Sequence, residues 1–182
     1  MGSVAVIALS LLSGACTEET TTPIASPPLL ETGADMVIQG LRHVVTLEGV
    51  KEAEVFADSA FFYRDSSIYH LVGPEMLLFV PGSGAQRARV TASRGRFNPT
   101  TQELVATGGV ILIITEGNKR VESEELHYDP NGDRIWSDSA TTMVEPGRVT
   151  EGFSFESDLN FRRTVVGPGS IRNTGGGGGL PD

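Results

Sequence analysis

The sequence has one cysteine, three histidines and few basic residues among its 182, and each shortage excludes a class of protein. Cys16 alone cannot form an internal disulfide or a cysteine-based zinc site, and His43, His70 and His127 lack metal-ligand spacing. The 14 Lys and Arg against 23 Asp and Glu argue against nucleic acid, because phosphate binding needs a basic surface. No apolar run approaches the roughly 20 residues of a conventional membrane-spanning helix.

Motifs for catalysis and nucleotide binding are also missing. The sequence contains no Gly-x-Ser-x-Gly elbow, no P-loop and no dinucleotide-binding glycine pattern. We therefore expect a protein that is not an enzyme and that needs no cofactor or metal. Glycine and proline, in contrast, are plentiful at 22 and 10 residues, and helix-period patterns are nearly absent, which favours a β protein rich in turns.

The N-terminus has the pattern of a bacterial lipoprotein signal. Residues 1–15 are uncharged, contain an apolar stretch of signal-peptide length and lead through small residues to Cys16. This segment resembles a lipobox, although Ser13 stands where Leu is preferred and no Lys or Arg precedes the apolar run. Cleavage before Cys16 would allow its acylation, and two or more acyl chains hold a protein on a membrane. The alternative is a buried free cysteine beside an N-terminal helix.

Both ends of the remaining chain are expected to be unstructured. Residues 17–32 are polar and proline-rich without periodicity, so residues 16–32 are interpreted as a lipidated cysteine and flexible tether. Residues 173–182 include a run of five glycines, whose backbone entropy favours disorder. The folded domain is therefore predicted to span residues 33–172.

The domain is built from a repeat. Shifted by 31 residues, the segment from Arg89 to Phe97 aligns with the segment from Arg120 to Tyr128, and an earlier copy begins at Val55. In each copy, small or apolar residues step by two, three and two positions: Val55, Ala57, Ala60, Phe62; Val90, Ala92, Gly95, Phe97; Val121, Ser123, Leu126, Tyr128. The extra residue predicts a bulge or corner that bends each strand at the same height. We expect an all-β fold, an open, twisted antiparallel jelly roll or half-barrel of about ten to twelve strands in repeated hairpins.

Two strands are apolar on both faces. Residues 110–114 (Val-Ile-Leu-Ile-Ile) and 76–80 (Met-Leu-Leu-Phe-Val) lack the alternation of their neighbours. A strand of this kind implies that its second face also meets something apolar. That could be a lipid, partner strands or a second layer of the fold, and the last alternative is the more common one.

One turn and two charged groups have alternative interpretations. Residues 129–133 begin like a calcium loop but lack its closing Glu, which favours a plain hairpin turn containing Asn131-Gly132. Strand alternation would separate Glu125 from Glu122 and Glu124, which favours a solvated face over a catalytic carboxylate pair. Arg94 and Arg96 could meet sugar phosphates, although arginines on an exposed strand usually serve solubility.

Four motifs between about Met36 and Arg172 occur together: the repeated Val-x-Ala/Ser-x-x-x-x-Phe/Tyr-x-Pro unit, Gly108-Gly109-Val110, Ile135-Trp136-Ser137 and the stretch from Val149 to Leu159. With these motifs the sequence resembles the LptC family of lipopolysaccharide export, within the wider OstA/LptA-like group of open β-jelly rolls. The resemblance implies a membrane-anchored periplasmic component that shelters the acyl chains of lipopolysaccharide. Its implied partners are the permease subunits of an inner-membrane ABC transporter and an LptA-like bridge protein, the first delivering the lipid and the second receiving it.

The candidate lipid-binding groove consists of inward positions of the repeat and of the doubly apolar strand: Val55, Phe62, Val90, Phe97, Val110, Leu112, Ile114, Val121, Leu126 and Tyr128. For each residue, ordinary core packing is the alternative. The implied location is the periplasm, anchored to the inner membrane through Cys16. Thr17 follows that cysteine where many inner-membrane lipoproteins have Asp, so anchoring to the outer membrane remains an alternative. Two other functions also remain, a structural or adhesive β-repeat surface lipoprotein and a periplasmic enzyme on a jelly-roll scaffold.

Overall fold

The computed structural model describes residues 33–173, which form one all-β domain of fourteen antiparallel strands. In chain order they are β1 (Met36–Leu47), β2 (Val50–Tyr63), β3 (Ile68–Val72), β4 (Glu75–Phe79), β5 (Gln86–Thr91), β6 (Arg94–Phe97), β7 (Leu104–Ile114), β8 (Lys119–Asp129), β9 (Arg134–Ser137), β10 (Thr141–Glu145), β11 (Arg148–Gly152), β12 (Phe155–Ser157), β13 (Thr164–Val166) and β14 (Gly169–Asn173). The all-β prediction is confirmed, but the expected number of strands was too low. The short C-terminal strands β13 and β14 carry no apolar alternation that would have marked them.

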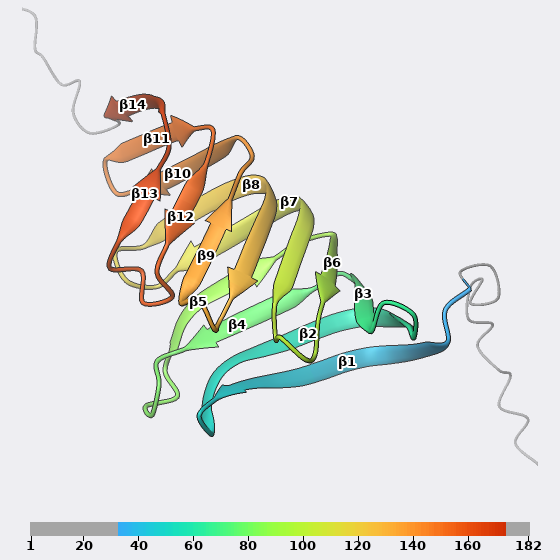
Figure 1. Ribbon diagram of the computed structural model, residues 1–182. Helices are drawn as coiled ribbons and strands as arrows, with labels where there is room; N and C mark the ends of the chain where they lie inside the picture. The colour runs from blue at the N-terminus through green and yellow to red at the C-terminus, as the bar shows by residue number, and fades with distance from the viewer. Residues whose placement is uncertain (1–32, 174–182) are drawn as a thin grey trace, which may run out of the picture.

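The strands form two layers that are continuous with each other through three long strands. β2 pairs with β4 along Ala53–Phe56 and with β3 along Ser59–Tyr63. In the same way, β7 pairs with β6 and then β5, while β8 pairs with β10 and then β9. Layer A therefore contains β4, β5, β10, β11 and β14, and layer B contains β3, β6, β9, β12 and β13, each completed by halves of the long strands. Figure 1 shows the resulting twisted stack, an open jelly roll.

The bends lie where the repeat has its extra residue. In β2 the bend separates Ala57 from Ala60, and in β8 it separates Ser123 from Leu126, so both inward faces are kept across the bend. In β7 the register shifts between Thr107 and Val110, and the intervening Gly108 and Gly109 have positive φ angles of 82° and 63°. Glycine takes this backbone conformation without the steric cost of a side chain. The predicted bend at a common height is confirmed.

The second face of the doubly apolar strand is not covered by another layer. Val110, Leu112 and Ile114 point into the core, while Ile111 and Ile113 are half-buried on the outside of layer A. There Ile113 lies between Arg89 and Arg120, and Ile111 lies between Thr91 and Glu122, on the paired strands. The interpretation of a second layer of the fold over this face was wrong, since no strand among residues 33–173 covers it. The aliphatic stems of long charged side chains can cover such residues while their charges stay in water.

The two ends of the stack present free strand edges. β1 pairs with β2 along one side, and no strand among residues 33–173 pairs with its other side. At the opposite end, β13 pairs only with β12 and β14 only with β11. Figure 1 shows these edges at opposite ends of the domain, the N-terminal edge at the lower right and the C-terminal one at the upper left.

Candidate functional site

The inner faces of the two layers form unbroken cross-strand rows of side chains. The central row of layer A runs from edge to edge through His43, Val55, Met76, Val90, Leu112, Val121, Met143, Thr150 and Ile171. The corresponding row of layer B runs through Met36, Phe62, Tyr69, Phe97, Leu104, Tyr128, Ile135, Ser157 and Thr164. We call the space between these rows the trough. Its rows are apolar from β2 as far as Met143 and Ile135, and Thr150, Ser157 and Thr164 add hydroxyl groups towards the C-terminal edge.

Every residue of the candidate groove lies on an inner face. Phe62 is half-buried and the others are buried, at most 2% exposed: Val55, Val90, Phe97, Val110, Leu112, Ile114, Val121, Leu126 and Tyr128. The nine buried residues belong to one continuous hydrophobic cluster in which the layers pack directly against each other, and Phe62 is not part of that cluster. The structure therefore brings the candidates together, in a closed arrangement filled by their own side chains.

Several inner-face residues were missed from the sequence. Met76, Leu104, Ile135, Met143 and Phe155 are buried between the layers in the same cluster. Their strands, except β7, are short, so a period of two is sampled only two or three times. These short strands are too short to show a pattern of their own. Their inward residues could have been found only from their pairing with the longer, repeated strands.

His43 is the one titratable residue in the central row of layer A. It lies on β1 with its ring centroid 4.7 Å from that of Phe97, across the trough. Burial lowers the pKa of His43 below its ordinary value, because the charged imidazolium is poorly solvated there. The neutral ring is thereby favoured, and it packs as part of the apolar lining.

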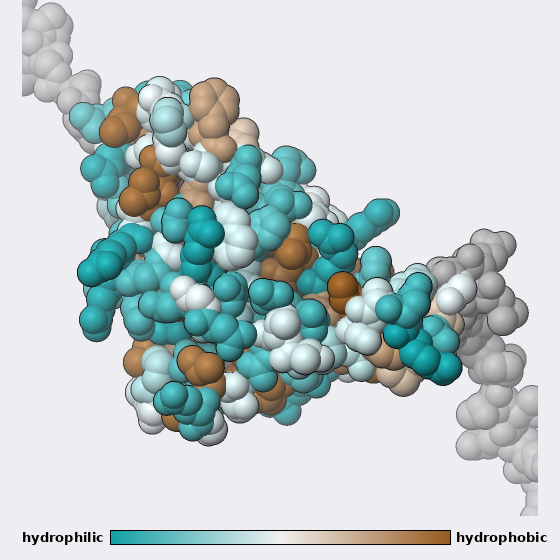
Figure 2. Space-filling view, in the orientation of Figure 1, coloured by the Kyte–Doolittle hydropathy of each residue, from teal (hydrophilic) through white to brown (hydrophobic). Residues whose placement is uncertain are grey.

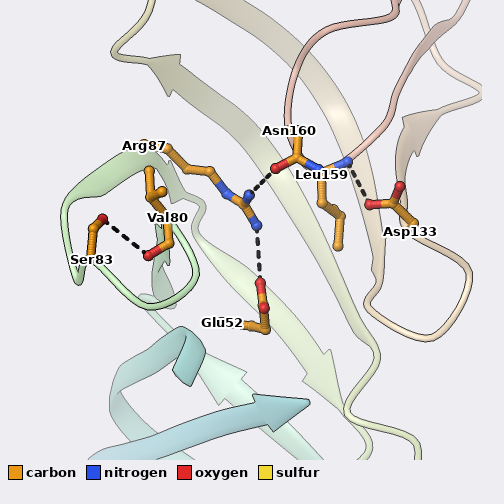
Figure 3. Close-up of polar contacts among 7 residues, drawn as sticks. All are labelled: Glu52, Val80, Ser83, Arg87, Asp133, Leu159 and Asn160. Carbon is orange, nitrogen blue, oxygen red and sulfur yellow. Dashed lines mark hydrogen bonds and ion pairs between the residues drawn. The ribbon is translucent and has the colours of Figure 1, made fainter. Parts of the chain in front are cut away.

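Opposite the bends, the hairpin turns of the two layers face each other, and we call this side the mouth of the trough. An ion pair between Glu52 of β2 and Arg87 of β5 lies here, with Nη2 to Oε2 at 3.1 Å and side chains only 12% and 10% exposed. Arg87 Nη1 also donates to Asn160 Oδ1 of the β12–β13 connection at 2.6 Å. Figure 3 shows the guanidinium between its two partners. Arg87 therefore links layer A to layer B across the mouth.

Two bulges account for the burial of this ion pair. Between Val45 and Thr46 of β1 the register of β2 jumps from Ala53 to Lys51, which leaves Glu52 as an extra residue. The register of β5 likewise jumps from Ala88 to Gln86, which leaves Arg87 unpaired. A bulge re-aims side chains away from strict alternation. Strict alternation with the inward Ala53 and Ala88 would place both side chains on the outer face, so the sequence does not mark them.

The segment Asp158–Arg163, which we call the strap, fills the mouth. Leu159 and Phe161 are 4% and 7% exposed and join the hydrophobic cluster. The Leu159 amide donates to Asp133 Oδ1 at 3.2 Å, and the amides of Arg162 and Arg163 donate to Asp158 Oδ1. Phe161 has a φ of +57°, an uncommon conformation for a large side chain. Tertiary contacts therefore hold the strap with its two apolar side chains inside the trough.

The calcium-like turn is a hairpin turn in which Asp129, Asn131 and Asp133 each make hydrogen bonds within the protein. Asp129 Oδ1 accepts hydrogen bonds from the amides of Asn131 and Gly132 at 2.9 and 3.0 Å. Asn131 donates through its side chain to the Thr101 carbonyl oxygen at 2.8 Å. Asp133 Oδ1 accepts the hydrogen bond from the Leu159 amide of the strap. Each polar group of the turn thus has a structural use.

The three glutamates of β8 are not divided as alternation predicts. The bend between Ser123 and Leu126 contains two residues, so Glu125 joins Glu122 on the outside, together with His127. Glu125 Oε1 lies 2.6 Å from His127 Nε2, and the His127 ring stacks on Trp136. The expected separation of Glu125 was wrong because the extra residue at the bend interrupts the period of two. These carboxylates face away from the trough.

The outer faces are predominantly polar. Arg94 and Arg96 are exposed on the outside of layer B, on the face opposite to the buried Gly95 and Phe97. Figure 2 shows a mainly hydrophilic surface on which apolar residues form separate patches, some of them at the C-terminal end at the upper left. At that end Phe153, Val165 and Ile171 are 74%, 60% and 65% exposed. Ile171 belongs to the central row of layer A, so the trough lining reaches the free C-terminal edge.

The expected lipidation site, Cys16, lies outside the described residues. Between residues 33 and 173 the chain contains no helix with the length and apolar character needed to cross a membrane. The same part of the chain contains no cluster of three or more His, Cys, Asp or Glu side chains placed to hold a metal ion.

Comparisons with known proteins identify the family. No curated protein matches the chain. Among solved structures, the chain is similar to LptH from Pseudomonas aeruginosa, described as the LptA homologous periplasmic component of the conserved lipopolysaccharide transport device; identity is 14%, the TM-score is 0.49, and 71% of this chain and 89% of that chain are covered. The family model described as "Lipopolysaccharide-assembly, LptC-related" matches residues 3–166. Because this match spans most of the sequence, the chain belongs to the LptC-related family of lipopolysaccharide-assembly proteins.

Proposed function

We propose that the protein carries lipopolysaccharide through the periplasm with its acyl chains held in the trough. The observation that supports this most directly is the pair of inner-face rows, which run without a break from the free edge of β1 to the free edges of β13 and β14. Exposing acyl chains to water costs about 0.8 kcal/mol per CH₂ group, so a lipid crossing an aqueous space needs continuous apolar cover. A trough open only in the middle could bind a lipid but could not pass it on.

The two edges fit two different partners. An unpaired strand can extend its sheet onto a neighbour by β-augmentation, with main-chain hydrogen bonds supplying the affinity. β1 follows the proposed tether and would face the permease subunits of an inner-membrane ABC transporter. β13 and β14 would then pair with an LptA-like bridge protein, and the exposed Ile171, which belongs to the central row of layer A, would continue the apolar path. ATP hydrolysis in the transporter would supply the energy.

Lipid entry requires the layers to part. The inner side chains are packed against each other, and the strap occupies the mouth. Acyl chains would displace these contacts and replace them with equivalent apolar contacts, so the net cost of opening is kept low. The bends act as the fixed side and the mouth as the side that opens.

A photo-crosslinker placed at Leu112 or Phe97 should capture lipopolysaccharide in cells with a working transporter, because both side chains face the trough. Glu122 is the matched control, since it is exposed on the outer face of β8. Capture from Glu122 alone, or from no position, would contradict lipid carriage. Normal outer-membrane lipopolysaccharide after clean depletion of the protein would favour the structural or adhesive surface lipoprotein instead.

We further propose that Cys16 is acylated and anchors the protein to the periplasmic face of the inner membrane. A clickable fatty acid fed to cells should label the wild-type protein, and Cys16→Ser should abolish labelling, because the chain contains no other cysteine. Membrane fractionation of the labelled protein identifies which membrane holds it. Equal labelling of both forms would contradict acylation at Cys16.

A further inference from the structure

Two buried hydrogen-bond donors in the trough lack partners. The Tyr128 hydroxyl and the Arg87 Nε have no hydrogen-bond partner among residues 33–173, although both atoms are shielded from solvent. Leaving a buried donor unsatisfied is unfavourable by about 1–3 kcal/mol. Native proteins keep few such groups, and each one calls for a functional or structural reason.

Both donors belong to the mouth of the trough. Arg87 donates through Nη2 to Glu52 and through Nη1 to Asn160, so Nε is the guanidinium nitrogen without a partner. Tyr128 lies near the end of β8. The turn that follows β8 contains Asp133, which accepts a hydrogen bond from the Leu159 amide of the strap. Burial and the nearby Glu52 carboxylate raise the pKa of Tyr128, so its hydroxyl stays protonated and can donate. A hollow of about 230 Å³ opens beside Arg87, bordered also by Glu52, Leu159 and Asn160, while Tyr128 is not among its lining residues.

The charges around this hollow disfavour an anionic ligand. Glu52 and Asp133 contribute two carboxylates to its lining, and Arg87 contributes one guanidinium. A phosphate would meet a net negative surrounding and would compete with Glu52 for the same guanidinium. Uncharged acceptor oxygens, in contrast, would give the two free donors partners without disturbing the ion pair.

Acyl lipids carry such an oxygen at the junction between the acyl chain and the polar head. In an acylated sugar the ester or amide carbonyl joins the apolar chain to the polar head. The mouth is the corresponding boundary of the protein, between buried Leu159 and Phe161 on one side and exposed turn residues on the other. An acyl chain lying in the trough would therefore place its carbonyl oxygen near the two donors.

We propose that the Tyr128 hydroxyl and the Arg87 guanidinium bind the acyl carbonyl oxygens of the lipid, an inference that rests on the lipid carriage proposed above. These two residues then set how deep each chain enters and leave the phosphorylated head outside. In the lipid-free protein both donors lack partners. They are therefore available to form hydrogen bonds with a lipid that enters the trough.

Tyr128→Phe separates this role from a structural one. In the full-length protein the substitution should weaken lipopolysaccharide binding by about fivefold, the equivalent of one hydrogen bond. The stability of the lipid-free protein should stay the same or rise, because the lost hydroxyl had no partner. Binding is measured by fluorescence titration and stability by denaturant unfolding. Tyr63→Phe, on the outer face of layer B beside His70, is the matched control.

Two phospholipid probes test the identity of the acceptor. Diacyl and dialkyl-ether phosphatidylglycerol of equal chain length share the phosphate and differ in the carbonyls. The wild type should bind the diacyl form more tightly, and Tyr128→Phe should narrow that difference. Unchanged lipopolysaccharide binding by the variant, or equal losses for both probes, would overturn the inference. Failure of the wild type to bind lipopolysaccharide at all would instead overturn the proposed function.

Discussion

Arg87→Met should lower the free energy of unfolding by about 3–5 kcal/mol, because it leaves the Glu52 carboxylate buried without its partner. The ion pair is 3.1 Å long with both side chains about nine-tenths buried, so water can replace little of the lost interaction. The substitution also removes the hydrogen bond to Asn160, through which layer A holds the strap. Urea unfolding followed by circular dichroism measures the loss.

Two variants show whether the charge or the position is responsible. Glu52→Leu combined with Arg87→Met should recover most of the stability, since replacing a whole buried ion pair by apolar side chains is often neutral. Arg89→Met is the matched control, because Arg89 pairs with Glu75 on the outer face with the two side chains 50% and 34% exposed. That pair should contribute about 0–1 kcal/mol. Equal losses for Arg87→Met and Arg89→Met would contradict the assignment of a buried ion pair at the mouth.

The bends and the inner face were predictable because their signal is local and repeated. Val55, Val90 and Val121 begin the same two-three-two step, and the structure places all three in one cross-strand row. The extra residue in each copy marks the bend, and Gly108-Gly109 marks it in β7. Such information survives in a single sequence because it depends on strand geometry alone.

The mouth could not be predicted in the same way. Glu52 and Arg87 are re-aimed by bulges, and a bulge without a repeated copy looks like ordinary alternation of outward charges. The strap has no periodicity, and one of its contacts comes from Arg87, which lies 73 residues away along the chain. Contacts that join distant segments through irregular backbone leave no local pattern. The missed part of the site is therefore the mouth with its strap, while the predicted part is the lining of the trough.

Phe97→Ala should cost the lipid-free protein about 3–5 kcal/mol, the usual loss when a buried aromatic side chain is truncated and a cavity remains. Phe97 is 1% exposed and contacts the His43 ring across the trough, so the cavity would open between the layers. Phe153→Ala is the matched control, because Phe153 is 74% exposed and its truncation should change stability by less than about 0.5 kcal/mol. Denaturant unfolding of the three proteins gives the values.

Repeating the Phe97 measurement with lipopolysaccharide distinguishes a trough from a permanent core. If acyl chains enter between the layers, they occupy the space that the missing ring leaves, and the lipid stabilises the variant more than the wild type. The stability gap between Phe97→Ala and wild type should then shrink as lipid is added, while Phe153→Ala follows the wild type throughout. A gap that stays constant at saturating lipid would mean that the chains never reach Phe97. The inner faces would then serve only as packing, and lipid would have to travel along another surface.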